Sequence, residues 1–202
     1  KEHNSEIWNN FINSEEAADR VFIHRILNKC HSKPEEFLTD ESIDQIEIEL
    51  DTVWKASKKQ NIIWSKYFLQ VADYIKIAWD EGDTIVGCGR GSGVGFYLNY
   101  LLDIIQIDPM VEKVPLFYWR FLNPERASIL DIDSDVQSNR RNKVIEALQN
   151  RYGEKRVIRV GTERTEGSKS AILTAARGLD IDNDTAQYIA SLIESDRGIQ
   201  RS

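Results

Sequence analysis

Three aspartates stand at alternate positions in the stretch "ILDIDSDV", and their spacing suggests a metal site. In an extended segment, side chains two residues apart face the same side, so Asp131 and Asp133 would lie about 7 Å apart. Like charges at this separation repel each other unless a cation lies between them. Hard oxygen ligands beside a phosphate favour Mg²⁺. We therefore predict a magnesium site here, although a solvated acidic turn fits the spacing equally well.

A calcium-binding loop also begins with alternating acidic residues, but this stretch does not continue as one. From Asp131, the sixth and twelfth positions are Val136 and Asn142, where an EF-hand loop requires Gly and Glu. The acidic run at 180–184 fails at the same two positions. We therefore exclude a calcium loop at both places.

Glycine stands at every second position of 87–95, directly after the β-prone run at 84–86. No frame of this stretch satisfies G-x-G-x-x-G, and the Gly-Lys-Ser/Thr of a P-loop is absent. Backbone N–H groups at Gly91 and Ser92, the Ser92 hydroxyl and the positive charge of Arg90 suit an anion such as phosphate. A plain tight turn that uses glycine for its backbone freedom is the competing interpretation.

The elements around these motifs alternate between helices and short strands. Apolar residues at three- and four-residue spacing predict helices at 14–26, 43–54, 64–79, 94–105, 144–152, 171–179 and 186–193. The β-prone or alternating segments 84–86, 127–136 and 156–160 predict strands. A phosphate turn on one strand and Asp-x-Asp on a later strand are typical of polymerase-beta-type nucleotidyltransferases, whose carboxylates hold metals that act on a triphosphate. The predicted fold class is α+β, a mixed sheet with helices.

The charge is distributed unevenly along the chain. The net charge of −7 taken whole argues against a nucleic-acid binder. Residues 140–177, however, hold ten Lys and Arg against four Glu. This basic stretch fits either a surface that follows a phosphate backbone or an ordinary solvated surface. Under the first interpretation, the DNA-backbone contacts are Arg140, Arg141, Lys143 and Lys169.

The composition indicates a folded protein in a reducing compartment. Hydrophobic residues make up 41% and charged residues 29% of the 202 residues, enough for a buried core. Cys30 and Cys88 form no ligand pattern, and no apolar run has transmembrane length. We expect a cytoplasmic protein without a membrane segment. Because the first residue is Lys, we also expect this chain to be a piece of a longer protein.

Several blocks of the chain resemble those of bacterial C-family DNA polymerases, the replicative DNA polymerase III α subunits. They include "YFLQV", "GCGRGS", "IQIDP", "RFLNPER" and "DIDSD", and they follow the family's order across residues 67–179. The combination is highly specific, although no single block is. Residues 41–66 fit more loosely and 1–40 weakly.

The resemblance implies roles for individual residues. Two aspartates match two of the family's three catalytic carboxylates, which hold two Mg²⁺ ions, and the glycine turn with two arginines matches the site for the dNTP triphosphate. The residues are Asp131 and Asp133 for catalysis and metal binding, and Arg90, Gly91, Ser92 and Arg120 for the triphosphate. The third carboxylate of the family has no counterpart in 134–202.

The resemblance also implies a domain organisation and partners. Residues 1–160 would form a polymerase-beta-type palm, with a mainly helical lead-in at 1–80 and the sheet with its catalytic motifs at 81–160. Residues 161–202 would begin a thumb domain. The implied partners are primer-template DNA, a dNTP and, through regions outside this chain, a sliding clamp and other replisome subunits.

Departures from the family pattern suggest a divergent, phage or mobile-element member. Cys88 stands where Pro is usual, Phe96 where a small Ser is frequent, and Glu163-Arg164 where a hydrophobic-Gly pair is common. None of these departures removes a residue assigned to the chemistry.

Two other functions compete with DNA polymerisation. A non-catalytic DNA- or phosphate-binding module that retains the palm fold is the main alternative, although it gives no reason for both aspartates. A nucleotidyltransferase with a small substrate is disfavoured by the "RFLNPER" block.

Overall fold

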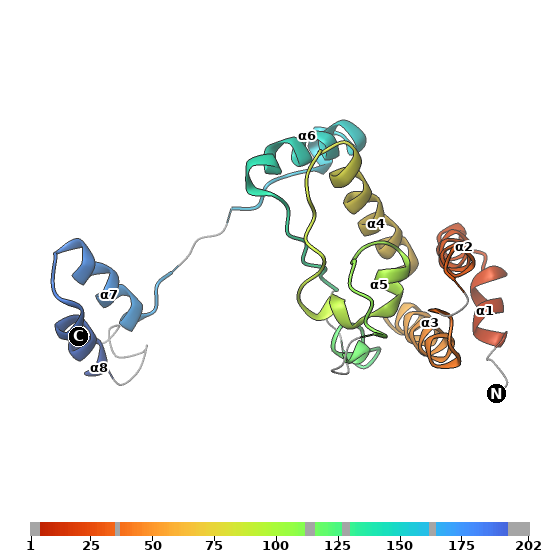
Figure 1. Cartoon of the computed structure of the whole chain (residues 1–202), viewed down its shortest axis with the longest axis horizontal. Coiled ribbons are helices and arrows are strands. Elements are labelled where there is room, and N and C mark those ends of the chain that lie inside the picture. Colours follow the sequence, from red (N-terminus) through yellow and green to blue (C-terminus); the bar gives the residue numbers. More distant parts are fainter. Residues whose placement is uncertain (1–4, 35–36, 112–115, 127–129, 162–164, 194–202) are drawn as a thin grey trace. The chain divides into compact units, whose positions relative to one another are not determined.

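The computed structural model describes residues 5–34, 37–111, 116–126, 130–161 and 165–193. It divides the chain into two compact units, residues 1–157 and 158–202. The α-helices labelled in Figure 1 are α1 (Ser5–Ile12), α2 (Ala17–Ser32), α3 (Asp40–Gln60), α4 (Trp64–Asp80), α5 (Tyr97–Leu101), α6 (Arg141–Tyr152), α7 (Ser168–Gly178) and α8 (Asn183–Ser191). Short 3₁₀ helices are η2 (Ser92–Gly95), η3 (Tyr118–Arg120), η4 (Ser138–Arg140) and η5 (Glu154–Arg156).

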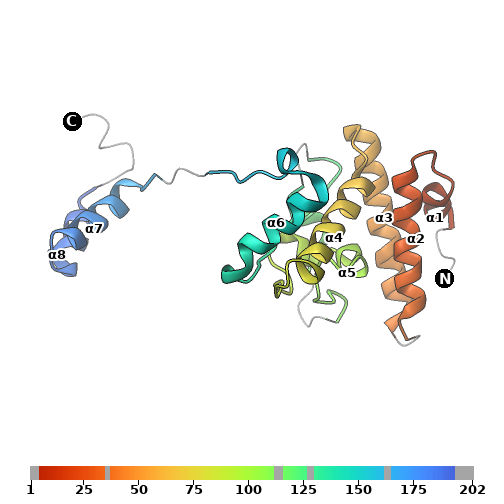
Figure 2. The same ribbon diagram turned by 90° about the horizontal axis from the view of Figure 1, so that it is seen from above.

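The first unit is built on the long helices α3 and α4. α2 packs against α1 and α4, and α3 also packs against α1 and α4 (Figure 2). The side chain of Thr39 caps α3 by accepting the Ser42 N–H at 3.2 Å. At the other end, Asn61 takes the left-handed conformation that ends many helices. The helices predicted at 43–54 and 64–79 are confirmed, and no helix in the described segments is long and apolar enough to cross a bilayer.

A chain of aromatic rings joins these helices to the glycine-rich segment. Phe11 contacts Phe22 with ring centroids 5.6 Å apart, and Phe22 contacts Phe68 at 5.6 Å. Phe68 stacks on Phe96 at 5.7 Å, and Phe96 contacts Phe121 at 5.0 Å. Phe96 is fully buried, and its burial contributes roughly 1.5–3 kcal/mol. The phenylalanine that departs from the family pattern therefore anchors the end of the glycine turn in the core.

The predicted mixed sheet is wrong. Among the described residues there is no β-strand, and the only ladder contact is an isolated antiparallel bridge between Val86 and Val136. Two backbone hydrogen bonds flank it, from Gly87 N–H to the Asp135 carbonyl at 2.8 Å and from Gln137 N–H to the Ile85 carbonyl at 3.2 Å. Two of the segments predicted as strands, 84–86 and the described part of 127–136, thus lie side by side but pair at one point; residues 127–129 lie outside the described residues. The α+β palm fold is therefore replaced by a mainly helical one.

In the described part of the chain, no third extended segment pairs with the two segments of the bridge. The predicted strand at 156–160 carries Ile158 and Val160 more than three-quarters exposed, and it joins no ladder. A lone pair of extended segments is marginally stable because its outer edges and one face stay in water. Glycine-rich residues 87–91 add conformational cost and offer few side chains to pack. A helix needs no such distant partner.

The second unit is a pair of helices, α7 and α8, that pack against each other. Its buried side chains are small, namely Ala176, Ala186 and Ala190. The carboxylate of Asp182 caps α8 by accepting the Thr185 N–H at 2.9 Å. Both helices predicted here are confirmed, while the thumb assignment stays a prediction.

Candidate active site

The glycine segment forms a tight turn that leads into η2 and α5. Gly89 and Gly91 have φ angles of +135° and +68°, a region that side-chain-bearing residues rarely adopt. Ser92 begins η2 and is exposed, and α5 follows directly after Phe96. The helix predicted at 94–105 therefore starts later and ends at Leu101, because Asp103 takes a left-handed conformation.

Asp133 lies directly against this turn. A Cβ atom placed on Gly91 would be 3.0 Å from Asp133 Oδ2, closer than about nine in ten real Cβ contacts. The bridge between Val86 and Val136 brings the two segments together. The structure thus places one predicted metal ligand beside the predicted phosphate turn, although they are separated by more than forty residues.

Arg90 lies between two carboxylates at the turn. Its guanidinium nitrogens are 3.5 Å from Asp133 Oδ1 and 3.5 Å from Asp135 Oδ1. The three side chains are half to two-thirds exposed, so each pair contributes little to stability. Arg90 therefore compensates the acidic charge of the site while remaining accessible to an anion.

Asp131 has a different neighbour. The carboxylate is exposed, and it lies close enough to the α4 residue Tyr67 to affect the ring hydroxyl. Burial is the main cause that raises the pKa of Tyr67, and the negative charge of Asp131 adds to it. Asp133 and Asp135 thus share Arg90, whereas Asp131 lies beside α4.

Arg120 is carried by a segment that packs against η2. A Cβ atom on Gly95 would be 3.3 Å from the Phe117 carbonyl oxygen, and one on Gly93 would be 3.7 Å from the Phe121 ring. Arg120 itself ends η3 and is exposed. The buried part of the "RFLNPER" block therefore fixes the position of η3 beside the turn, while its arginine stays at the surface.

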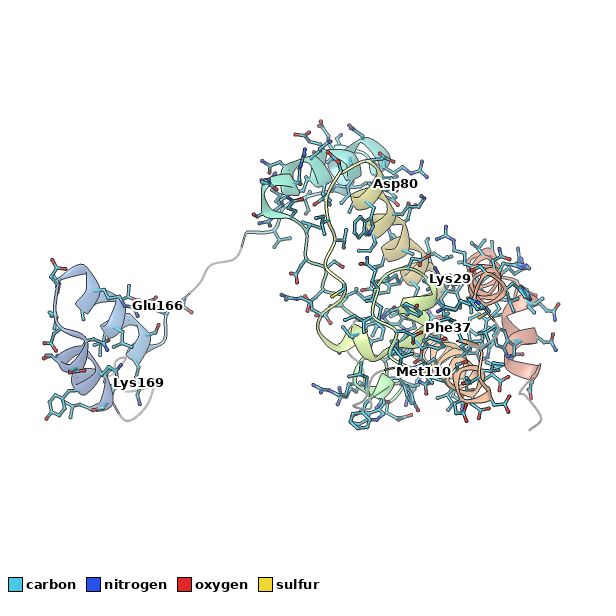
Figure 3. All side chains as sticks on the ribbon, viewed as in Figure 1. Lys29, Phe37, Asp80, Met110, Glu166 and Lys169 are labelled. Carbon is cyan, nitrogen blue, oxygen red and sulfur yellow. The ribbon has the colours of Figure 1, made fainter. Side chains whose placement is uncertain are left out.

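The predicted DNA contacts fall into two places. Arg140 and Lys143 lie 3.4 and 3.1 Å from Asp83 Oδ2. The hydrogen bond from Lys143, its charge and that of Arg140 lower the pKa of the Asp83 carboxyl. Arg141 begins α6 and is exposed. Lys169 belongs to α7 of the second unit, where Figure 3 labels it.

The oxygen ligands of the site fit Mg²⁺ chemically. Asp131 and Asp133 are exposed carboxylates, and Mg²⁺ is usually held by one or two carboxylates together with substrate phosphates and water. Asp133 also lies against the turn that would carry the phosphates. Over the described residues, no group of three or more His, Cys, Asp or Glu side chains has the arrangement of a metal cage.

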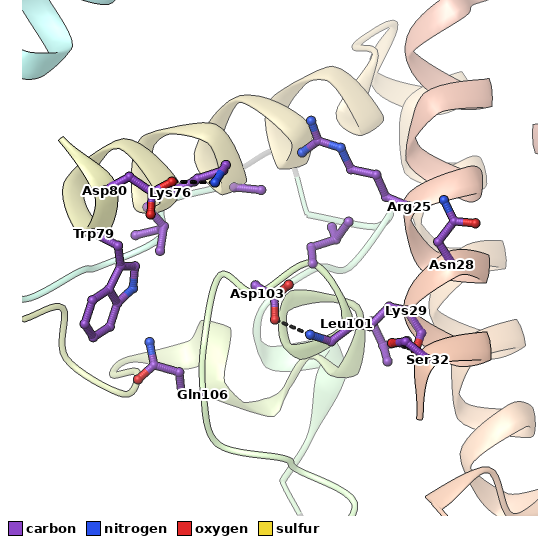
Figure 4. A pocket seen from close by; sticks show the side chains of 13 residues that line it. Arg25, Asn28, Lys29, Ser32, Lys76, Trp79, Asp80, Leu101, Asp103 and Gln106 are labelled. Carbon is purple, nitrogen blue, oxygen red and sulfur yellow. Dashed lines mark hydrogen bonds and ion pairs between the residues drawn. The ribbon is translucent and has the colours of Figure 1, made fainter. Parts of the chain in front are cut away.

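A cavity of about 660 Å³ lies elsewhere, between α2, α4 and α5 (Figure 4). Its lysines are engaged, Lys29 with Asp103 and Lys76 with Asp80. None of the predicted site residues lines it. The candidate active site is instead an exposed surface around the glycine turn.

Comparison with known proteins identifies the family. Residues 18–202 match the family model described as the bacterial DNA polymerase III alpha NTPase domain. The chain belongs to this family. The match includes every predicted site residue of the DNA polymerase III alpha pattern, from Arg90 to Lys169.

Relatives of the DNA polymerase III alpha family include bacterial and phage proteins. The chain is 44% identical over 159 residues to the probable DNA polymerase YorL of Bacillus subtilis and, equally, to the DNA-directed DNA polymerase of Bacillus phage SPbeta. It is 42% identical over 128 residues to DNA polymerase III subunit alpha of Thermus aquaticus. These alignments cover 77%, 77% and 63% of this chain but only 12%, 12% and 10% of the relatives. The predicted resemblance to C-family DNA polymerases is confirmed.

Sequence reasoning assigned no role to three acidic residues that contact the predicted site residues or, in one case, the helix that follows the glycine turn in this member of the DNA polymerase III alpha family. Asp135 shares Arg90 with Asp133. It stands two residues after Asp133, so the spacing that grouped Asp131 with Asp133 could also have indicated Asp135. Asp83 pairs with two of the predicted DNA contacts. Glu49 lies in the core on α3, and it accepts a hydrogen bond from Tyr97, a contact that no local sequence pattern predicts.

Proposed function

We propose that this chain is part of the catalytic subunit of a DNA-directed DNA polymerase that transfers a nucleotide from a dNTP to a primer 3′-hydroxyl and releases pyrophosphate. The placement of the Asp133 carboxylate against the Gly91 backbone, with Arg90 beside it, supports this proposal most directly. A phosphate-binding turn and a metal-binding carboxylate are the two parts that nucleotidyl transfer requires at one place.

Each residue has a distinct task in this mechanism. Asp131 and Asp133 would hold two Mg²⁺ ions, which when bound lower the pKa of the primer hydroxyl and compensate the charge of the leaving pyrophosphate. The N–H groups of the Gly91–Ser92 turn and the Ser92 hydroxyl would bind triphosphate oxygens. Arg90 and Arg120 would contribute positive charge where the negative charge of the transferred phosphate develops.

DNA binding would involve the basic residues of the same chain. Arg140, Arg141, Lys143 and Lys169 are exposed and would contact the phosphate backbone, so binding should be independent of sequence and sensitive to salt. The complete protein would work in the cytoplasm in DNA replication, with a sliding clamp and further replisome subunits as partners outside this chain.

The test is primer extension by the complete polymerase that contains these residues. Asp133→Asn keeps the shape of the side chain but removes its charge, and it should reduce templated extension on the order of 100-fold or more. Asp51→Asn, which breaks an exposed pair with Lys55 on α3, is the matched control and should leave extension unchanged. Full extension by Asp133→Asn, with unchanged Mg²⁺ dependence, would place catalysis outside this chain and make the chain a non-catalytic DNA-binding module of that polymerase.

A further inference from the structure

We propose that Glu49 is a positioning residue for nucleotide binding. From α3 it fixes the short helix α5 and thereby, through Asn99, the glycine turn that would hold the triphosphate. This inference rests on the proposed function of the turn. It assigns a role in the site to a carboxylate that lies in the core and touches neither substrate nor metal.

Glu49 is fully buried and caps α5. Its Oε1 accepts the Tyr97 N–H and its Oε2 accepts the Leu98 N–H, each at 2.8 Å. The Nε2 of Gln45, one turn earlier on α3, donates to Oε1 at 2.8 Å. α5 has five residues and no side-chain cap of its own, so its first N–H groups need an acceptor from elsewhere. Both oxygens of Glu49 are therefore committed to holding this helix end.

Asn99 carries the constraint from α5 back to the turn. Its Nδ2 donates to the Gly93 carbonyl oxygen at 2.9 Å, and its side chain is fully buried. Its backbone carbonyl accepts the Ile104 N–H at 2.9 Å, which closes the far end of α5. Gly93 lies within η2, the helix that Ser92 begins. A displacement of α5 would thus be transmitted to Ser92 and Gly91.

Burying the charge of Glu49 costs free energy, and the two N–H bonds from α5 offset part of this cost. Burial raises the pKa of this carboxyl to about 7, while the bonds from Gln45, Tyr97 and Leu98 act in the opposite direction. A glutamine of the same shape offers one acceptor oxygen, and its NH₂ group would face the second backbone N–H. The amide would therefore satisfy one donor of α5 and repel the other.

Glu47 provides a matched control on the same helix. It is also buried, but it accepts a hydrogen bond from Trp8 Nε1 at 3.0 Å, and Trp8 lies on α1. Changing it to glutamine alters the hydrogen bond between α3 and α1 and leaves the two bonds from α5 to Glu49 in place. The two substitutions thus separate loss of core stability from loss of turn position.

The experiment compares Glu49→Gln, Glu47→Gln and Asn99→Asp in the complete polymerase. Steady-state single-nucleotide incorporation gives KM for dNTP and kcat, and thermal unfolding gives the midpoint of each variant. We expect Glu49→Gln and Asn99→Asp to raise KM for dNTP about tenfold, the effect of losing one charge-assisted or buried hydrogen bond. The dissociation constant for primer-template DNA should stay within twofold of wild type. Glu47→Gln should lower the thermal midpoint and leave KM within twofold.

Each result either supports the inference or overturns it. An unchanged KM in Glu49→Gln with a lowered midpoint would make Glu49 a structural residue only. If Glu49→Gln does not fold, the test uses Asn99→Asp, because this variant leaves the cap of α5 intact. An unchanged KM for dNTP in Asn99→Asp then overturns the inference. Asp133→Asn, measured in the same experiment, distinguishes failure of the proposed function from failure of the role of Glu49. Its full activity would remove the proposed function itself, whereas its inactivity with unchanged KM in both positioning variants would remove only the role of Glu49.

Discussion

Gly91 meets two requirements that no other residue meets at this position. Its φ angle of +68° strains any residue with a side chain, and a Cβ atom would lie 3.0 Å from Asp133 Oδ2. We therefore predict that Gly91→Ala displaces the Asp133 carboxylate and lowers primer extension by the complete polymerase at least about tenfold, with a stability loss of roughly 1–2 kcal/mol. Gly178→Ala is the control, since nothing lies within 4 Å of its added Cβ. Equal activity of both variants would contradict the close approach of Asp133 to the turn.

Glu49 should also leave a signature in the pH dependence of stability. Its pKa is raised from 4.5 to about 7 in the folded chain, so between these values the folded state binds more protons than the unfolded state. Stability from this group is therefore highest at low pH and is lost as pH rises towards 7. We predict that the free energy of unfolding of the wild type, relative to Glu49→Gln, falls by roughly 3 kcal/mol between pH 4.5 and 8. Denaturant titrations at several pH values measure this difference. A difference that stays flat or rises with pH would show that the pKa of Glu49 is not raised in the folded chain.

At the scale of elements, the start of α6 and the loop at Asp83 form one charged surface. Asp83 neutralises part of the positive charge of Arg140 and Lys143. We predict that Asp83→Asn tightens binding of duplex DNA at low salt. The combined change of Arg140, Arg141 and Lys143 to Gln should weaken binding to all sequences alike and reduce the salt slope.

The control for this surface removes the same charge from another helix. Changing Lys55, Lys58 and Lys59 on α3 to Gln alters the net charge equally, but on a different element. Fluorescence anisotropy with a labelled duplex at several salt concentrations compares the two triple variants. Equal weakening by both would show that net charge, rather than the surface at α6, governs the affinity.

The helices were predicted correctly from the sequence, and the mixed sheet was predicted wrongly, for a physical reason. Each hydrogen bond of α3 or α4 joins residues four apart, so amphipathic spacing and caps such as Thr39 determine them locally. A strand needs a partner from a distant segment. Among the described residues, Val86 forms a bridge with Val136 alone, and residues 156–160 form none.

The same contrast applies to the site. The family pattern predicted both Asp133 and the Gly91 turn, because each belongs to a short motif of consecutive residues. Pairs such as Asp83 with Lys143 or Glu49 with Tyr97 join residues far apart in sequence and leave no such string. Only the packing of α3 against α5 shows that a buried glutamate contacts the helix that follows the turn.

At the scale of the whole molecule, we predict that these 202 residues fold but do not polymerise. Folding is expected because one core cluster includes residues of α1 to α6 and of the glycine segment, with Phe68 and Phe96 at its centre. Catalysis is not expected, because two carboxylates are too few to fix two Mg²⁺ ions about 3.5–4 Å apart. The third carboxylate that the family pattern implies has no counterpart in 134–202, and the chain spans 12% of the length of its Bacillus relatives.

The measurement that checks this prediction is primer extension at equal concentrations of the 202-residue chain and of the complete polymerase, with circular dichroism to confirm that the shorter chain is folded. A metal held by too few ligands is misplaced, and a misplacement of about 1 Å already costs on the order of 100-fold in rate. The folded short chain should therefore bind DNA in a salt-dependent way without extending the primer. Templated extension by the short chain that is abolished by Asp133→Ala would show that residues 1–202 contain a complete active site, and that another group among them replaces the third carboxylate.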